Sequence, residues 1–135
     1  MYHQTFVYSY FTDDIYTVSL LMIVEGINET SFVSMKPMLV NIVAGITNSS
    51  ASAIELRIKR RIISNDSVEY SCKVSVRPTD RNHEKYVVSK MEFGDSFLFE
   101  INSIIQNQTT ENVLRVIYVS PLQRRPGNLT YVKVF

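Results

Sequence analysis

The feature that most constrains the fold of this chain is a pair of alternating segments, residues 54–62 and 68–76. Along each segment, apolar residues alternate with charged or small polar ones, as in a strand with one buried and one solvated face. The apolar positions are Ile54, Leu56, Ile58 and Ile62, then Val68, Tyr70, Cys72, Val74 and Val76. Because the two segments are close in sequence, they predict one antiparallel β-hairpin.

The register of this hairpin is restricted because the buried faces of its two strands must coincide. Keeping Ile62 on the buried face requires a loop with an odd number of residues, or a bulge in one strand. A two-residue turn at Asn65-Asp66 would set Glu69 against Ile62 on the buried side, and it is rejected for that reason. A three-residue loop is preferred, because Asn and Asp tolerate the left-handed backbone that such a loop needs.

The remaining elements follow from periodicity on either side of the hairpin. Residues 15–24 predict a first strand and residues 113–119 a last one. Two apolar stripes at helical spacing predict two helices, the first with Phe32, Met35, Leu39, Ile42, Val43 and Ile46, the second with Phe97, Ile101, Ile104 and Ile105. Asp95 is predicted to cap the second helix, and Pro37 fits the first only near its first turn or at a kink. Residues 79–83 are expected as a polar connection, and residues 84–93 fit either a short helix or an extended segment.

This order of elements predicts the α+β class. The specific expectation is a ferredoxin-like split β-α-β-β-α-β sandwich, an antiparallel sheet with two helices on one face. A chain of 135 residues is most simply one domain. We therefore divide it into an N-terminal extension (1–14), an α+β domain (15–120) and a C-terminal tail or edge strand (121–135).

Five Asn-x-Ser/Thr triplets, the acceptor pattern for N-linked glycans, begin at Asn28, Asn48, Asn65, Asn107 and Asn128. The frequencies of Asn, Ser and Thr in this chain would produce about 1.6 such triplets by chance. All five fall at predicted element boundaries: between strand and helix, after each helix, at the hairpin tip and in the tail. Because a glycan must stand in solvent, this placement predicts an extracellular or cell-surface glycoprotein.

The chain between about Ile15 and Val119 resembles the SEA domain, a ferredoxin-like module of mucins, agrin-like matrix proteins and other glycosylated surface proteins. The matching features are a first helix ending near Gly45-Ile46, the run Ser50-Ala51-Ser52-Ala53-Ile54-Glu55-Leu56 that enters the second strand, and a hairpin tip followed by Ser67-Val68. The resemblance implies a ferredoxin-like extracellular module of a glycosylated surface protein.

Some SEA domains cleave their own backbone at a Gly-Ser bond in this hairpin. Ser67 matches the serine of that bond, but Asp66 stands where the family motif has Gly, and Glu69-Tyr70 interrupt the valine run that follows. Asp adopts the strained backbone geometry less readily than Gly. Self-cleavage is therefore not expected.

The residues that usually carry chemistry are few in this chain. Neither of its two histidines, His3 and His83, has Cys or carboxylate neighbours at metal-ligand spacing, so no metal site is predicted and both are expected to be solvated. Cys72, the one cysteine, is expected to be a small buried apolar residue. Since there is no Gly-rich phosphate loop and no G-x-S-x-G turn, no catalytic residue and no cofactor are predicted.

The polar face of the hairpin is a candidate binding surface. Its basic residues are Arg57, Lys59, Arg61, Lys73 and Arg77. RNA-binding sheets stack bases on aromatic side chains of their central strands, where this chain has Glu69, Ser71, Lys73 and Ser75, so no nucleic-acid partner is expected. A second basic pair, Arg124-Arg125, is compatible with a protease site, a polyanion site or a basic tail.

These observations predict a non-catalytic extracellular module of a larger surface glycoprotein, acting in adhesion, spacing or self-association. Its partner would be another protein or a second copy of the module, and it would meet a membrane only through the parent protein. The alternative is an intracellular ferredoxin-like binding module whose basic sheet face takes RNA or an acidic protein.

Overall fold

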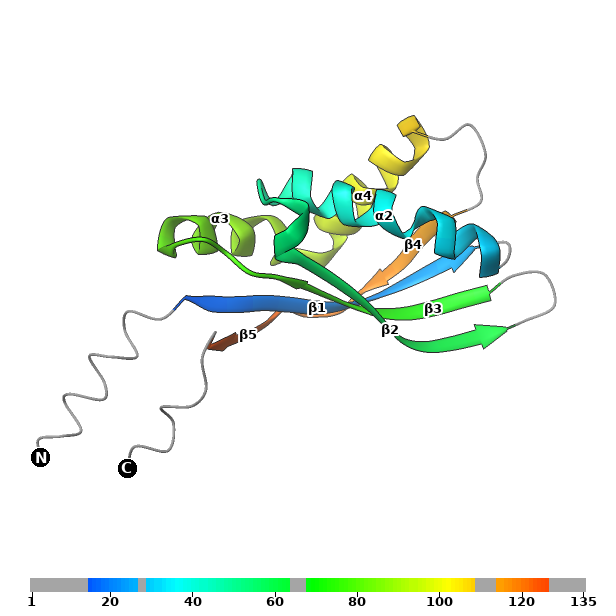
Figure 1. Ribbon diagram of the computed structural model, residues 1–135, viewed down its shortest axis with the longest axis horizontal. Helices are drawn as coiled ribbons and strands as arrows, with labels where there is room; N and C mark the ends of the chain where they lie inside the picture. The colour runs from blue at the N-terminus through cyan, green and yellow to red at the C-terminus, as the bar shows by residue number, and fades with distance from the viewer. Residues whose placement is uncertain (1–14, 27–28, 64–67, 109–113, 127–135) are drawn as a thin grey trace, which may run out of the picture.

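The computed structural model describes residues 15–26, 29–63, 68–108 and 114–126. They form an α+β fold in which three α-helices cover one side of a five-stranded antiparallel sheet (Figure 1). The elements in chain order are β1 (Tyr16–Gly26), α2 (Glu29–Ile46), the 3-10 turn η1 (Ala51–Ala53), β2 (Ile54–Ile63), β3 (Val68–Val76), α3 (Arg81–Met91), α4 (Gly94–Gln108), β4 (Leu114–Val119) and β5 (Gln123–Pro126). The α+β class is as predicted, but the described helices number three, where the sequence predicts two.

The sheet has the strand order β2-β3-β1-β4, and every pair of neighbours is antiparallel. The short strand β5 pairs with Tyr16–Ser19 of β1, on the same edge where β4 pairs with Met22–Gly26. Two successive short strands thus line one edge of β1. The edge-strand interpretation of residues 121–135 corresponds, over Gln123–Pro126, to β5. This topology is compatible with a ferredoxin-like fold.

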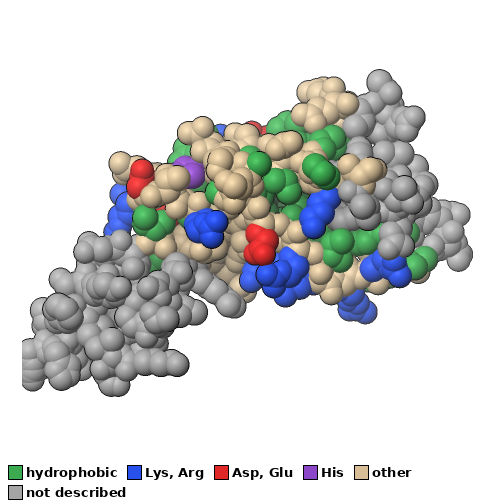
Figure 2. Space-filling model, in the orientation of Figure 1, with side chains coloured by type: hydrophobic (Ala, Val, Ile, Leu, Met, Phe, Trp, Pro, Cys, Tyr) green, Lys and Arg blue, Asp and Glu red, His purple; other side chains and the backbone are tan. Residues whose placement is uncertain are grey.

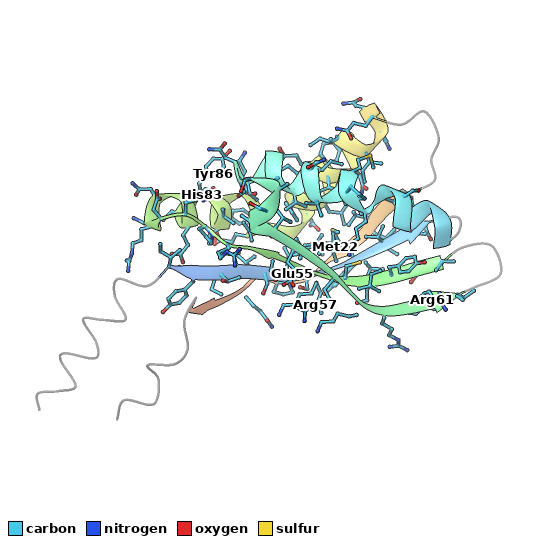
Figure 3. All side chains as sticks on the ribbon, in the orientation of Figure 1. Met22, Glu55, Arg57, Arg61, His83 and Tyr86 are labelled. Atoms are coloured by element: carbon cyan, nitrogen blue, oxygen red, sulfur yellow. The ribbon has the colours of Figure 1, made fainter. Side chains whose placement is uncertain are left out.

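The hydrophobic core lies between the sheet and the helices, where Met22 projects from β1 toward the helical layer (Figure 3). Alternate residues of β1 and β3 are buried because a strand turns successive side chains to opposite faces. The buried strand residues are Val18, Leu20, Met22, Val24, Ile54, Leu56, Val68, Tyr70, Cys72, Val74, Val76, Leu114 and Val116. The helices contribute Leu39, Ile42, Val43, Ala44, Ile46, Val87, Met91, Phe97, Ile101 and Ile105.

The predicted hairpin is present, but its register changes along its length. From Ile54 to Ile58 the pairing has the predicted parity, with Ile58 opposite Cys72. A β-bulge then inserts Lys59 as an extra residue, and beyond it Ile62 lies opposite Glu69. The prediction that Ile62 faces the core is therefore wrong, and 45% of its surface is exposed. One extra residue reverses the facing of every residue after it. The hairpin tip, residues 64–67, lies outside the described residues.

The segment that the sequence leaves open, residues 84–93, belongs to helix α3 as far as Met91. The helix begins earlier than the expected polar connection allows, because Asp80 acts as its N-cap and accepts a hydrogen bond from the His83 backbone N–H at 2.8 Å. Such a cap satisfies one of the unpaired donors of the first turn. The prediction that residues 79–83 form a connection is thus wrong from Arg81 onward.

The ends of the other two helices also differ in detail from the prediction. Helix α4 begins at Gly94, so Asp95 lies in its first turn rather than at the cap. Pro37 lies well inside helix α2, not near its first turn. Helix α2 ends in a Schellman motif: the N–H groups of Asn48 and Ser49 donate to the carbonyls of Gly45 and Ala44, and Asn48 has a φ of 54°.

Helix α4 holds the outer side of β4 through one side chain. The Asn102 amide donates to the Val116 carbonyl and accepts from the Val116 N–H, both at 2.8 Å. These are the two backbone groups with which a further strand would pair. Asn102 therefore occupies part of the edge that an added strand would need, a common protection of sheet edges.

A partly buried ion pair connects β5 to helix α3. Only 4% of the Glu84 surface is exposed, and Glu84 shares the inner face of α3 with Val87 and Met91. Its carboxylate accepts a hydrogen bond of 2.5 Å from the guanidinium of Arg124, which also lies 5.3 Å from the centre of the Tyr16 ring. Arg124 thus has a structural contact within the fold, and Arg125 is paired with Thr17 in β5.

Candidate functional site

The face of the sheet opposite the helices, which we call the open face, is the principal candidate surface. Its strand positions are those that alternate with the core residues, including Leu21 and Ile23 of β1, Lys73 of β3 and Arg57 of β2. Figure 2 shows several Lys and Arg side chains along the lower margin of the molecule, on the side where the sheet lies in Figure 1.

Three of the five predicted binding residues lie on the open face: Arg57 and Lys73 are direct cross-strand partners, and Lys59 is the bulge residue next to them. Arg77 is exposed just beyond the end of β3, where its N–H donates to the Ala53 carbonyl. The structure thus gathers Arg57, Lys59 and Lys73 and leaves Arg77 at the end of the hairpin.

The prediction that Arg61 lies on the open face is wrong. Arg61 lies at the far end of β2 from Arg57 (Figure 3), opposite the buried Tyr70, so its register position belongs to the helix side of the sheet. Strict alternation along β2 would place the charged Arg60 on the helix side of the sheet, together with Ile54, Leu56 and Ile58. A charged residue at a core-facing position was the sequence signal for a bulge. In the structure, Arg60 instead lies opposite Ser71 and replaces Arg61 on the open face.

Carboxylates neutralise part of the charge on the open face. Arg57 forms an ion pair with Glu55 at 2.9 Å, side by side on β2 (Figure 3), and Arg115 pairs with Glu25 at 3.0 Å. Both pairs are solvent-exposed, and such pairs are typically worth less than about 1 kcal/mol. The face is therefore mixed in charge, with a modest excess of cations around Lys59 and Lys73.

The apolar residues of the open face lie on β1 and β4. Leu21 is 42% exposed, and Tyr118 of β4, 47% exposed, lies opposite Ile23. A second bulge makes Ile117 an extra residue beside Tyr118. Sequence reasoning considered only the hairpin, and so missed this aromatic on the outer strand. A base-stacking platform uses aromatics on the central strands, where β1 and β3 carry Ser19, Leu21, Ser71 and Lys73.

Two of the five glycan-acceptor asparagines are described, and both are exposed. Asn48 occupies the left-handed position that ends α2, and Asn107 lies in the last turn of α4 rather than after it. Asn28, Asn65 and Asn128 lie outside the described residues. The exposure that a glycan requires is therefore present at Asn48 and Asn107.

His83 is not the solvated surface residue expected from sequence. Its Nδ1 accepts a hydrogen bond of 3.0 Å from the Thr79 N–H, so the proton of the neutral ring is on Nε2. Nε2 then donates to the Thr47 carbonyl at 3.0 Å and lies 3.2 Å from the Ser49 hydroxyl. A general base would need an unprotonated nitrogen toward the serine, so this Ser-His contact serves to hold α3 against the end of α2.

Cys72 is buried in the core, as predicted, with none of its surface exposed. Desolvation raises the pKa of its thiol to about 11, an effect that Lys36 partly opposes. Since the thiolate is the nucleophilic form, the native thiol is unreactive near neutral pH.

We expect Cys72 to react with a thiol reagent at pH 8 only as fast as the chain unfolds, and at once in denaturant. Rapid stoichiometric labelling of the native protein would contradict this.

The raised pKa of Cys72 also stabilises the fold below the unfolded value of 9.0, and this contribution declines as the pH rises from there toward 11. Cys72→Ala should lack that part of the alkaline decline.

No group of three His, Cys, Asp or Glu side chains suited to a metal ion is found among the described residues. Within the same residues, no helix has the length and apolar character needed to cross a membrane. No protein-family model, curated protein or solved structure matches the chain.

Proposed function

We propose that this chain is a non-catalytic, glycosylated extracellular module of a larger surface protein, with a ferredoxin-like fold similar to the SEA domain. The strand order β2-β3-β1-β4, with the three described helices on one side of the sheet, supports the ferredoxin-like assignment. Its role would be adhesion, spacing or self-association, with a protein partner or a second copy.

The observation that carries this proposal is the placement of the acceptor triplets. Asn48 and Asn107 lie at the C-terminal ends of two different helices and are both exposed, so a glycan on either would project into solvent without disturbing the core. Asn48 belongs to the triplet completed by Ser50, which is also exposed. The excess of such triplets over chance adds to this argument.

The open face favours a protein partner over RNA. The bulge at Lys59 takes Arg61 out of the predicted basic surface, and Arg57 is engaged by Glu55. The exposed Leu21 lies opposite Lys73, and the exposed Tyr118 lies opposite Ile23 on the other side of β1. A surface of mixed charge with exposed apolar side chains is typical of transient protein contacts rather than of a phosphate-binding groove.

The proposal is tested by glycan mapping after secretion from a eukaryotic host with the parent protein's leader. Peptide:N-glycosidase converts an occupied Asn to Asp, and we expect this conversion at Asn48 and Asn107 and at one or more of the other three acceptors. Asn82, which is exposed but lies outside any acceptor triplet, is the internal control for spontaneous deamidation.

Asn48→Gly is the matched variant, because glycine also adopts the left-handed backbone of that position and should leave the fold intact. It should lose one glycan and keep the thermal stability of the unglycosylated chain. A secreted protein with no modification at any acceptor, or a native protein confined to the cytosol, would refute the extracellular assignment.

A further inference from the structure

A cavity of about 390 Å³ opens on the open face, between the centre of the sheet and the segment that links β4 to β5. Its walls come from β1 (Ser19, Leu20, Leu21), from Lys59 and Lys73 of the hairpin, and from Ser120, Pro121, Leu122 and Gln123. This volume is in the range of pockets that hold small molecules.

Two irregularities in the sheet create this cavity. The β4–β1 pairing ends at Val119, and the β5–β1 pairing resumes only at Gln123. In between, Ser120 remains attached to β1, since its hydroxyl accepts from the Leu21 N–H and its N–H donates to the Leu21 carbonyl, both at 2.8 Å. On the other side, the bulge in β2 brings Lys59 to the cavity wall beside Lys73.

The polar groups of this cavity favour an anion. Lys73 faces Arg57 directly across the strands, a like-charge pair that costs stability, and Lys59 adds a third cation nearby. The carboxylate of Glu55 is engaged by Arg57, and neither Lys59 nor Lys73 forms an ion pair with a described residue. An anion between the two ammonium groups would relieve this repulsion through charge-assisted hydrogen bonds.

The other walls favour an apolar group attached to that anion. Leu21, Pro121 and Leu122 present hydrocarbon to the cavity, and the core residue Leu20 borders it. Ser19 also lines it, with only 3% of its surface exposed, and its hydroxyl makes no hydrogen bond to a described residue. A serine hydroxyl at a cavity wall can donate a hydrogen bond to a ligand oxygen.

We propose that this cavity is a binding site for a small amphiphilic anion, a monocarboxylate with a short alkyl chain. Its carboxylate lies between Lys59 and Lys73, and its chain lies along Leu21 and Leu122. This proposal is independent of the extracellular role, because it rests on the cavity alone.

The test is a titration of the isotope-labelled protein followed by two-dimensional NMR, with three probes. Octanoate carries both the anionic head and the chain, acetate carries only the head, and octylammonium carries the chain with the opposite charge. We expect octanoate, below its micellar concentration, to cause saturable shift changes at Ser19–Leu21, Lys73 and Ser120–Gln123. The other two probes should bind at least about tenfold more weakly.

Charge-removing variants separate a specific site from general surface binding. Lys59→Gln combined with Lys73→Gln should weaken octanoate binding by about tenfold or more. Lys85→Gln removes an exposed lysine from α3 and should leave the affinity unchanged. Equal binding of octanoate and octylammonium, an unaltered affinity in the double variant, or no saturable shift at the cavity residues would each overturn the proposal.

Discussion

Replacement of Phe97 by alanine is expected to lower the free energy of unfolding by about 3–5 kcal/mol, the usual cost of truncating a fully buried aromatic. Phe97 projects from α4 into the core and none of its surface is exposed. Removing the ring leaves a cavity that the surrounding side chains fill only in part, so both the transfer energy and the packing contacts are lost. Urea denaturation, analysed at constant m-value, measures the change.

Phe99→Ala is the matched control, because Phe99 lies two residues away in the same helix and is 71% exposed. Its truncation should change the stability by less than about 0.5 kcal/mol, since little buried surface is lost. Similar losses for the two variants would show that the inner face of α4 is assigned incorrectly.

The second large effect is expected at the ion pair between β5 and α3. Arg124→Ala should lower the free energy of unfolding by about 2 kcal/mol, because it leaves the Glu84 carboxylate buried without its cation. The estimate is below the 3–5 kcal/mol typical of fully buried pairs, because the Arg124 side chain is 51% exposed. Thermal and urea unfolding of purified variants measure it.

The control for this prediction is the exposed pair of Arg115 and Glu25. Arg115→Ala should cost less than about 1 kcal/mol, since water screens that pair. Combining Glu84→Leu with Arg124→Leu removes both charges and should restore most of the stability lost in Arg124→Ala. A double variant as unstable as Arg124→Ala would mean that the loss comes from packing of the arginine stem, not from an unpaired carboxylate.

Helix α3 shows why the sequence did not decide between a helix and an extended segment for residues 84–93. Its inner face has the spacing Glu84, Val87, Met91, which is helical, but its first member is a carboxylate and reads as a solvent-facing residue. The partner that makes its burial acceptable is Arg124, 40 residues further along the chain. No local sequence pattern predicts such a pair, because the two charges come together only when β5 joins the sheet.

The residues of the candidate cavity could likewise be predicted only in part from the sequence. Lys59 and Lys73 could be placed on the open face from the hairpin alternation alone. Ser19, Ser120 and Leu122 could not be joined to them, because the cavity depends on where the pairing of β1 passes from β4 to β5. That interruption is a property of the assembled sheet.

By itself, the sequence determined the elements with strong periodicity, namely the hairpin strands and helices α2 and α4. It also determined that acceptor triplets lie at the ends of those two helices. These features depend on the spacing of neighbouring residues, which a chain carries without its fold. Only the tertiary structure decided which basic side chains share the open face. The bulge at Lys59 exchanges Arg61 for Arg60, because one inserted residue reverses the facing of all that follow it, and the whole sheet sets where that residue is tolerated.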